Sequence, residues 1–258
     1  MLLAIDSGNT NAVFAVFDGT ARRGEWRAST DPARTADEYA VWLTQLMSLD
    51  GLAREDVDAA IVANVVPATA HALSVLCRRY FGCRPMIVGE DGVALGIEVR
   101  LPNPAEVGAD RLVNAVAAHA RYPGCDKIIV DFGTATTFDV VDKSGAYAGG
   151  VIAPGPNLSL EALYMAAAKL PGISIRRPSH VIGTATVPAM QSGVYWGYVG
   201  LIEGLVQRMK AEFGGPMTVI ATGGLSALFG DATKIIDTVD PDLTMLGLLD
   251  IHRRNRKP

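Results

Sequence analysis

The chain has 258 residues, of which 49% are hydrophobic and 19% are charged, so it can bury a large core and is not a disordered chain. Its 23 lysines and arginines against 27 aspartates and glutamates give a formal net charge of -4, which offers no broad basic surface to nucleic acid. No segment resembles the roughly 20 apolar residues of a membrane span, and the three cysteines have neither zinc-site nor disulfide-framework spacing, so we expect a cytoplasmic protein without nucleic-acid or membrane partners.

The first half of the chain alternates short strands with helices. Predicted strands span residues 2–6, 11–17, 24–28, 59–63 and 85–88. The predicted helices begin behind a capping box at Thr35 to Glu38 and also cover residues 67–80 and 111–122. The first three strands are joined by short turns, which predicts an antiparallel meander followed by crossover helices.

The second half repeats this opening. Predicted strands span residues 127–131, 136–141, 146–152 and 217–221, and predicted helices span residues 158–168 and 188–212, a short stretch after Gly224, and residues 242–254. The element Asp6-x-Gly8 recurs as Asp131-x-Gly133, 125 positions further along the chain. Asp-x-Gly turns also arise by chance, but the flanking strands match too. We therefore predict two related domains, residues 1–115 and 116–240, and a C-terminal helix in 241–258 that packs back toward the first.

The glycines and backbone N–H groups of both repeated turns suit the binding of a phosphate. Glycine lets an anion approach the backbone without a Cβ clash, and the exposed N–H groups of such turns attract it. The aspartate that ends each strand would repel a phosphate unless a cation lies between them. Asp6 and Asp131 therefore predict metal ions that bridge to phosphates, with the two loops clamping a nucleotide.

Two further features have both a functional and a purely structural interpretation. Gly223 and Gly224 follow a strand, where they provide either a platform for adenine or an ordinary strand-to-helix turn. Asp110 lies at the start of a helix, where it either caps the helix or accepts a proton from an alcohol substrate during phosphoryl transfer. Arg111 beside it could hold an anionic substrate group or pair with a surface acid.

Taken together and in order, the motifs resemble those of the type III pantothenate kinase family. These motifs are Asp6-x-Gly8-Asn9-Thr10, Gly108-Ala109-Asp110-Arg111, Asp131-Phe132-Gly133-Thr134-Ala135-Thr136, Gly149-Gly150-x-Ile152-x-Pro154-Gly155 and Met190-Gln191-Ser192-Gly193. The segment Ala221-Thr222-Gly223-Gly224-x-Ser226 fits the same scheme. The resemblance implies an α/β fold of two duplicated actin-like (ribonuclease H-like) domains with mixed sheets flanked by helices. The family belongs to the acetate and sugar kinase, heat-shock and actin superfamily, so the resemblance also implies an ATP cleft between the two domains.

The resemblance also implies an activity and residue roles. The activity is transfer of the γ-phosphate of ATP to the primary hydroxyl of pantothenate, the first step of coenzyme A synthesis, with Asp110 as the base. Implied ATP contacts are Asp6, Ser7, Gly8, Asn9, Thr10, Asn11, Ala12, Val13, Thr134, Gly223 and Gly224. Implied substrate contacts are Gly108, Ala109, Asp110, Arg111 and Thr186. Asp131 matches a site for potassium or ammonium, and Asp6 would hold the magnesium that accompanies ATP, through water.

The sequence departs from the pattern of the family at two places. Leu101 stands where some members have tyrosine, and Thr184-Ala185 where many have Lys-Asn.

Members are homodimers, and we expect an interface on the long helix, although an ordinary buried helix would explain the same apolar residues. The interface candidates are Val194, Tyr195, Trp196, Tyr198, Val199, Leu201, Ile202, Leu205 and Val206. Alternative functions are a non-catalytic transcriptional accessory factor, a kinase for another small hydroxy acid or sugar, and an actin-like filament.

Overall fold

The computed structural model describes residues 1–167 and 170–256, which divide into two compact units. Unit 1 combines the first 121 residues with the C-terminal segment from Asp242, and unit 2 runs from Tyr122 to Pro241. The helix over residues 109–121 therefore belongs wholly to unit 1, whereas the sequence placed a division inside it, at 115/116. The last two residues of the expected C-terminal segment, 257 and 258, lie outside the described part of the chain.

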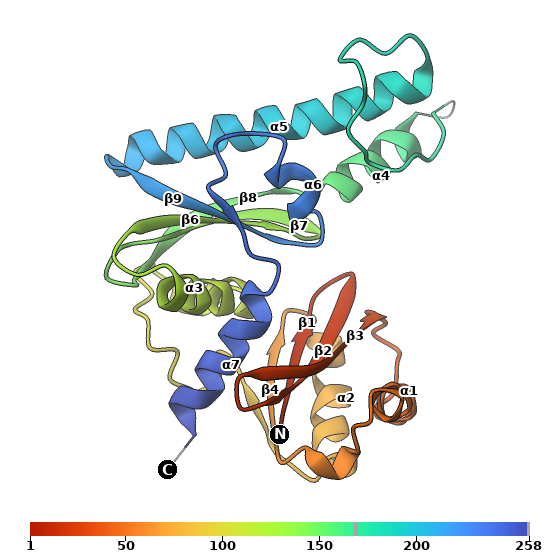
Figure 1. Ribbon diagram of the computed structural model, residues 1–258, viewed down its shortest axis with the longest axis vertical. Helices are drawn as coiled ribbons and strands as arrows, with labels where there is room; N and C mark the ends of the chain where they lie inside the picture. Colours follow the sequence, from red (N-terminus) through yellow and green to blue (C-terminus); the bar gives the residue numbers. More distant parts are fainter. Residues whose placement is uncertain (168–169, 257–258) are drawn as a thin grey trace. The chain divides into compact units, whose positions relative to one another are not determined.

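Unit 1 is a five-stranded mixed sheet with helices on both faces (Figure 1). Its strands are β1 (Leu2–Ser7), β2 (Asn11–Asp18), β3 (Ala21–Ser29), β4 (Ala59–Asn64) and β5 (Pro85–Ile87). Its helices are α1 (Ala36–Leu49), α2 (Ala70–Val75), α3 (Ala109–Arg121) and α7 (Leu243–Asn255), with short helical turns η1 (Arg54–Asp56), η2 (Pro67–Thr69), η3 (Leu76–Tyr80) and η4 (Pro104–Glu106). The sheet order is β3-β2-β1-β4-β5.

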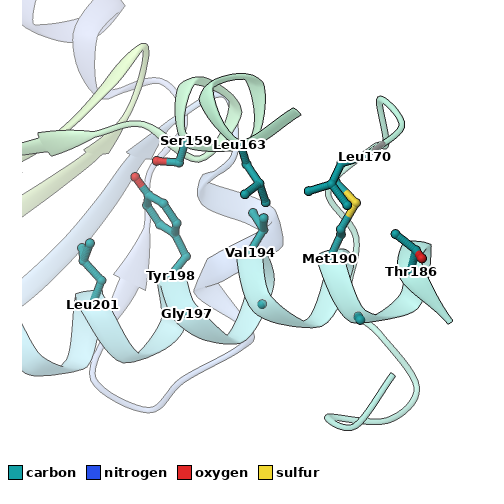
Figure 2. Close-up of a pocket in the computed structure, with 11 residues that line it drawn as sticks. Ser159, Leu163, Leu170, Thr186, Met190, Val194, Gly197, Tyr198 and Leu201 are labelled. Atoms are coloured by element: carbon teal, nitrogen blue, oxygen red, sulfur yellow. The ribbon is translucent and has the colours of Figure 1, made fainter. Parts of the chain in front are cut away.

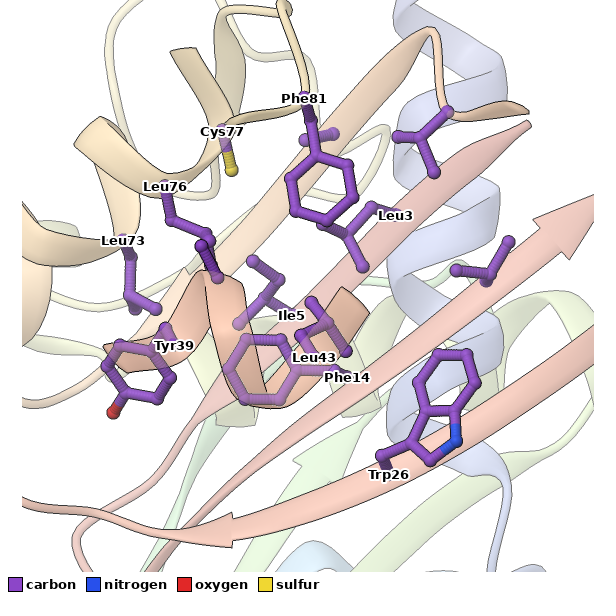
Figure 3. Packing of buried hydrophobic residues seen from close by; sticks show 14 of the residues in the cluster. Leu3, Ile5, Phe14, Trp26, Tyr39, Leu43, Leu73, Leu76, Cys77 and Phe81 are labelled. Atoms are coloured by element: carbon purple, nitrogen blue, oxygen red, sulfur yellow. The ribbon is translucent and has the colours of Figure 1, made fainter. Parts of the chain in front are cut away.

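Alternation along β1 explains why helices cover both faces of this sheet. Leu3 and Ile5 point into one core, and Leu2 and Ala4 point into the other. Figure 3 shows the first core, where Phe14 of β2 packs against Tyr39 and Leu43 of α1. The second core includes side chains of α3 and α7, and these helices approach so closely that a Cβ on Gly247 would lie 2.3 Å from the backbone oxygen of Val113.

Unit 2 repeats the same sheet. Its strands are β6 (Asp126–Phe132), β7 (Ala135–Val141), β8 (Tyr147–Pro154), β9 (Met217–Gly223) and β10 (Thr238–Val239), in the order β10-β9-β6-β7-β8. Its helices are α4 (Pro156–Ala166), α5 (Thr186–Phe213) and α6 (Ser226–Gly230). In the reverse direction the order is β8-β7-β6-β9-β10, which corresponds to β3-β2-β1-β4-β5 of unit 1. In both sheets the first three strands are antiparallel, and the fourth pairs in parallel with the third. The predicted α/β duplication is confirmed.

Local sequence signals explain most of the element boundaries. The capping box at Thr35 is present: its backbone N–H donates to Glu38 Oε2 at 2.7 Å, and its hydroxyl accepts from the backbone N–H of Glu38. The helix expected over 67–80 is instead three consecutive segments, η2, α2 and the π-helical turn η3. The helix expected over 158–168 runs from Pro156 to Ala166 and ends at Ala167, whose backbone is extended, and residue 168 lies outside the described part.

Candidate active site

The first loop, residues 6–11, joins β1 to β2 and is closed by its own backbone. The N–H of Gly8 donates to the oxygen of Asn11 at 3.0 Å. Thr30, the residue directly after β3, donates its N–H to Thr10 O at 2.9 Å and its hydroxyl to Gly8 O at 2.6 Å. Asp6 is half-buried, whereas Asn9 and Thr10 are exposed. The loop is thus rigidly supported while its tip faces solvent.

A buried hydrogen bond between the hydroxyls of Ser7 and Thr69 links the first loop to the rest of unit 1. Ser7 Oγ lies 3.1 Å from Thr69 Oγ1, and both side chains are almost fully buried. Thr69 in turn donates to Val66 O at 2.9 Å, and Val65 donates its N–H to Ser7 O at 3.1 Å. This link joins the loop to the turn that follows β4.

Asp110 is the second residue of helix α3, and the residue before that helix, Gly108, lies close to the same turn. A Cβ on Gly108 would lie 3.6 Å from Val65 Cγ1 and 2.6 Å from Asp110 Oδ1, so glycine at 108 gives the carboxylate its room. Burial raises the pKa of Asp110, opposed by the backbone N–H of Arg111, which donates to Asp110 Oδ1 at 2.8 Å. Gly108 and the first loop therefore both lie near Val65 in the turn after β4, and burial makes the Asp110 carboxylate more basic than an exposed aspartate.

The second loop, residues 131–135, joins β6 to β7 and has the same construction. Gly133 donates its N–H to Ala135 O at 3.1 Å, and Gly155, directly after β8, donates to Thr134 O at 2.9 Å. A Cβ on Gly155 would lie 2.2 Å from Thr134 O, so only glycine allows this approach. Thr134 is exposed, and Asp131 is half-buried at the base of the loop.

The glycine pair after β9 lies beside Asp131. Gly223 has φ of +88°, and a Cβ there would lie 2.3 Å from Asp131 Oδ1 and 2.8 Å from Phe132 O. Ser226 donates its hydroxyl to Gly223 O at 2.7 Å, which fixes the start of α6. Asp131, Thr134, Gly223 and Gly224 therefore belong to one edge of the unit 2 sheet.

Thr186 lies in a different setting, at the first turn of α5. It lines a largely apolar groove of about 570 Å³ between α4 and α5, whose lining includes none of the second-loop residues. Figure 2 shows Leu163 of α4 facing Val194 of α5, with Thr186 near the end of the groove. The structure does not group Thr186 with the loop residues of its own unit.

The apolar residues of α5 divide between core and surface. Tyr195, Tyr198, Val199, Ile202 and Val206 are buried in the core of unit 2. These five interface candidates are therefore unavailable to a partner, because they cover their own sheet. Val194, Trp196, Leu201 and Leu205 are only partly buried.

Four residues that support the site escaped the sequence-based candidates. Thr30, Thr69 and Gly155 hold the two loops, and Thr222 lies next to Asp131. Gly155 and Thr222 lie inside motifs quoted above, so a signal existed. Nothing local marks Thr30 or Thr69, because their partners are distant in sequence.

The described residues contain no cluster of three or more His, Cys, Asp or Glu that could hold a metal ion. Within residues 1–167 and 170–256, no helix is both long and apolar enough to cross a bilayer.

The duplicated sheets, each with an Asp-ended strand and a glycine loop, define an α/β fold of two related units with mixed sheets, as the sequence predicted. Solved structures share this fold: a Baf-family protein from Campylobacter jejuni (17% identical, 98% of each chain, TM-score 0.62) and an activator of 2-hydroxyisocaproyl-CoA dehydratase from Clostridium difficile with bound ADPNP (12% identical, 100% of this chain and 98% of that one, TM-score 0.56).

The chain belongs to the type III pantothenate kinase family. The model of that family matches residues 2–208. Proteins named type III pantothenate kinase are 67% identical in Paramagnetospirillum magneticum, over 100% of this chain and 99% of that one, and 66% identical in Rhodospirillum rubrum, over 99% of each. The resemblance seen in the sequence motifs is confirmed.

Proposed function

We propose that this protein transfers the γ-phosphate of ATP to the primary hydroxyl of pantothenate, the first committed chemistry of coenzyme A synthesis. The observation that carries the proposal is the placement of Asp110 beside the first loop, through Gly108 and Val65, in a chain whose full-length relatives bear the pantothenate kinase name. An alcohol acceptor needs a base for its proton, and otherwise mainly positioning and charge stabilisation.

Asp110 accepts the proton of the substrate hydroxyl in this proposal. Its pKa is raised by burial, which brings the base closer to neutral pH and makes it a better acceptor. The N–H of Arg111 holds one carboxylate oxygen, so the other can face the substrate. We assign Gly108, Ala109 and Arg111 to the pantothenate site, with Thr186 as a further contact.

The two loops bind the phosphates of ATP through the backbone and side-chain donors of residues 6–13 and Thr134, and Gly223 with Gly224 supports the adenosine. Bound cations neutralise the polyphosphate and polarise it toward transfer. Asp6 would hold magnesium through water, because its cross-strand neighbours are Ala63 and Val13, which offer no side-chain oxygen. Asp131 would hold potassium or ammonium, since both of its cross-strand neighbours, Thr137 and Thr222, carry a hydroxyl oxygen.

We further propose a homodimer that packs through α5. Gly193, Gly197 and Gly200 are exposed, and no atom lies within 4 Å of a Cβ built on any of them. Glycine inside a helix costs about 1 kcal/mol relative to alanine, so their spacing of four and three residues favours close contact with another helix. A cytoplasmic location accords with the three cysteines, which are free of disulfides.

The test is ATP-dependent formation of phosphopantothenate by the purified protein with magnesium and potassium. We expect turnover by the wild type and a loss of roughly 10²–10⁴-fold in kcat for Asp110→Asn. Asp250→Asn is the matched control, because Asp250 is also a partly buried acid with a raised pKa but lies on α7. Full activity of Asp110→Asn would exclude Asp110 as the base, and an inactive wild type would exclude the proposed reaction.

A further inference from the structure

The buried hydroxyl of Thr222 in unit 2 has no hydrogen-bond partner among the described residues. Thr222 lies near the end of β9 and is 1% exposed. Native proteins satisfy the large majority of buried polar side-chain atoms, so an exception calls for a missing ligand or water.

The sheet register shows what Thr222 faces. Thr222 is the parallel partner of Asp131, so both side chains project from the same face of the sheet. The next residue, Gly223, packs tightly against Asp131, because a Cβ there would lie 2.3 Å from Asp131 Oδ1, 2.7 Å from Phe132 N and 2.8 Å from Phe132 O. The hydroxyl of Thr222 is therefore on the same face of the sheet as the Asp131 carboxylate, next to the glycine that packs against that carboxylate.

We infer that Thr222 Oγ1 is a ligand of the monovalent cation at Asp131. This inference rests on the proposed function, which assigns that cation to Asp131. A hydroxyl oxygen supplies lone pairs without adding charge, which suits a singly charged, oxygen-loving ion that must shed part of its hydration shell. With the Asp131 carboxylate, Thr222 supplies one neutral and one charged oxygen donor on the same face of the sheet.

The other neighbour of Asp131 does not have the same freedom. Thr137 is its antiparallel partner, but its hydroxyl donates to Asp139 Oδ2 at 3.0 Å. Asp139 is fully buried and also accepts from the Tyr147 hydroxyl at 2.7 Å. The Thr137 hydroxyl is therefore already hydrogen-bonded to Asp139, whereas the Thr222 hydroxyl has no hydrogen-bond partner among the described residues.

Unit 1 provides an internal comparison. The residue at the position of Thr222, the parallel partner of the loop acid, is Ala63, and the antiparallel partner is Val13. Around Asp6, then, neither cross-strand neighbour carries a side-chain oxygen. An oxygen-rich setting is thus specific to Asp131, as expected if the ion there is held by direct contacts.

The experiment measures ion binding without relying on turnover. The thermal unfolding midpoint of the full chain is followed against KCl, with choline chloride keeping the ionic strength constant, in the presence and absence of magnesium and a non-hydrolysable ATP analogue. For the wild type we expect a midpoint that rises with KCl and saturates. For Thr222→Val we expect the half-saturating KCl concentration to rise about tenfold or more, and for Thr222→Ser to stay within about twofold, because the oxygen is kept.

Thr136→Val is the matched control. Thr136 is equally buried and equally without a hydrogen-bond partner among the described residues, but it pairs with Phe132 and so projects from the opposite, core-facing side of the sheet. We expect its half-saturating KCl concentration to equal that of the wild type. If Thr222→Val fails to fold, Thr222→Ala makes the same comparison.

The outcomes separate this inference from the proposed function. An unchanged KCl response in Thr222→Val, with a higher midpoint in choline chloride, would overturn the inference and identify the hydroxyl as a merely unsatisfied group. A wild type that phosphorylates pantothenate but ignores KCl would also overturn it, and would leave the phosphotransfer standing. A KCl response that depends on Thr222 in a protein inactive toward pantothenate would support the ion site and reject the substrate.

Discussion

The two glycine loops have nearly the same backbone but different surroundings. In each, the residue directly after the third strand donates its N–H to a loop carbonyl at 2.9 Å, from Thr30 to Thr10 in unit 1 and from Gly155 to Thr134 in unit 2. Around the acids, however, Ala63 and Val13 flank Asp6, whereas Thr222 and Thr137 flank Asp131. The duplicated backbone therefore gives both loops the same support, whereas the side chains beside the two acids differ.

The largest effects are expected when each loop acid, Asp6 or Asp131, is replaced by asparagine. Asp131→Asn removes the only charged ligand that we assign to the monovalent ion. We expect activity to fall by roughly 10²-fold and to stop responding to KCl. Asp6→Asn should lower activity comparably but keep the KCl response, since magnesium is the ion affected. Initial rates across a KCl and magnesium grid distinguish the two. Identical responses of both variants would show that the acids are equivalent.

Alanine at the loop glycines tests the difference in packing. A Cβ on Gly155 would lie 2.2 Å from Thr134 O, whereas one on Gly8 would lie 3.3 Å from Asn11 O. Gly155→Ala should cost about 1–3 kcal/mol of stability, and Gly8→Ala less than about 1 kcal/mol. At ~2–4 °C per kcal/mol, thermal unfolding resolves these values. The KM for ATP should also rise more for Gly155→Ala, and a larger loss for Gly8→Ala would contradict the assignment of tight packing to unit 2.

The smallest effect concerns Asp110, which lies beside the first loop. Its pKa in the folded chain is raised above the ordinary 3.8, so folding disfavours the ionised form. The contribution of Asp110 to stability is therefore fully present below about pH 3.8 and is lost as the pH rises through the raised pKa. Asp110→Asn has no such charge, so we expect it to be slightly more stable than the wild type at pH 7. The difference should shrink as the pH falls, and a gain that grows toward acid pH would contradict the burial argument.

The sequence predicted the fold and the main site features because their signals are local. A strand ending in Asp, a glycine turn and a returning strand are all encoded within about a dozen residues, and the repeat made the duplication visible. The capping box at Thr35 and the start of α3 near Asp110 were predicted for the same reason. The C-terminal helix was also visible, but its close packing against Val113 depends on Gly247, more than a hundred positions away.

The sequence by itself determined the family, the two loops and the candidate acids, because each rests on residues that are neighbours along the chain. Only the tertiary structure decided which of these residues meet. It placed five apolar residues of α5 in the core, joined Ser7 to Thr69, and set Thr222 beside Asp131. The physical reason is that strand register and side-chain burial depend on pairing between distant segments, and a buried hydroxyl without a partner becomes visible only when all its neighbours are in place.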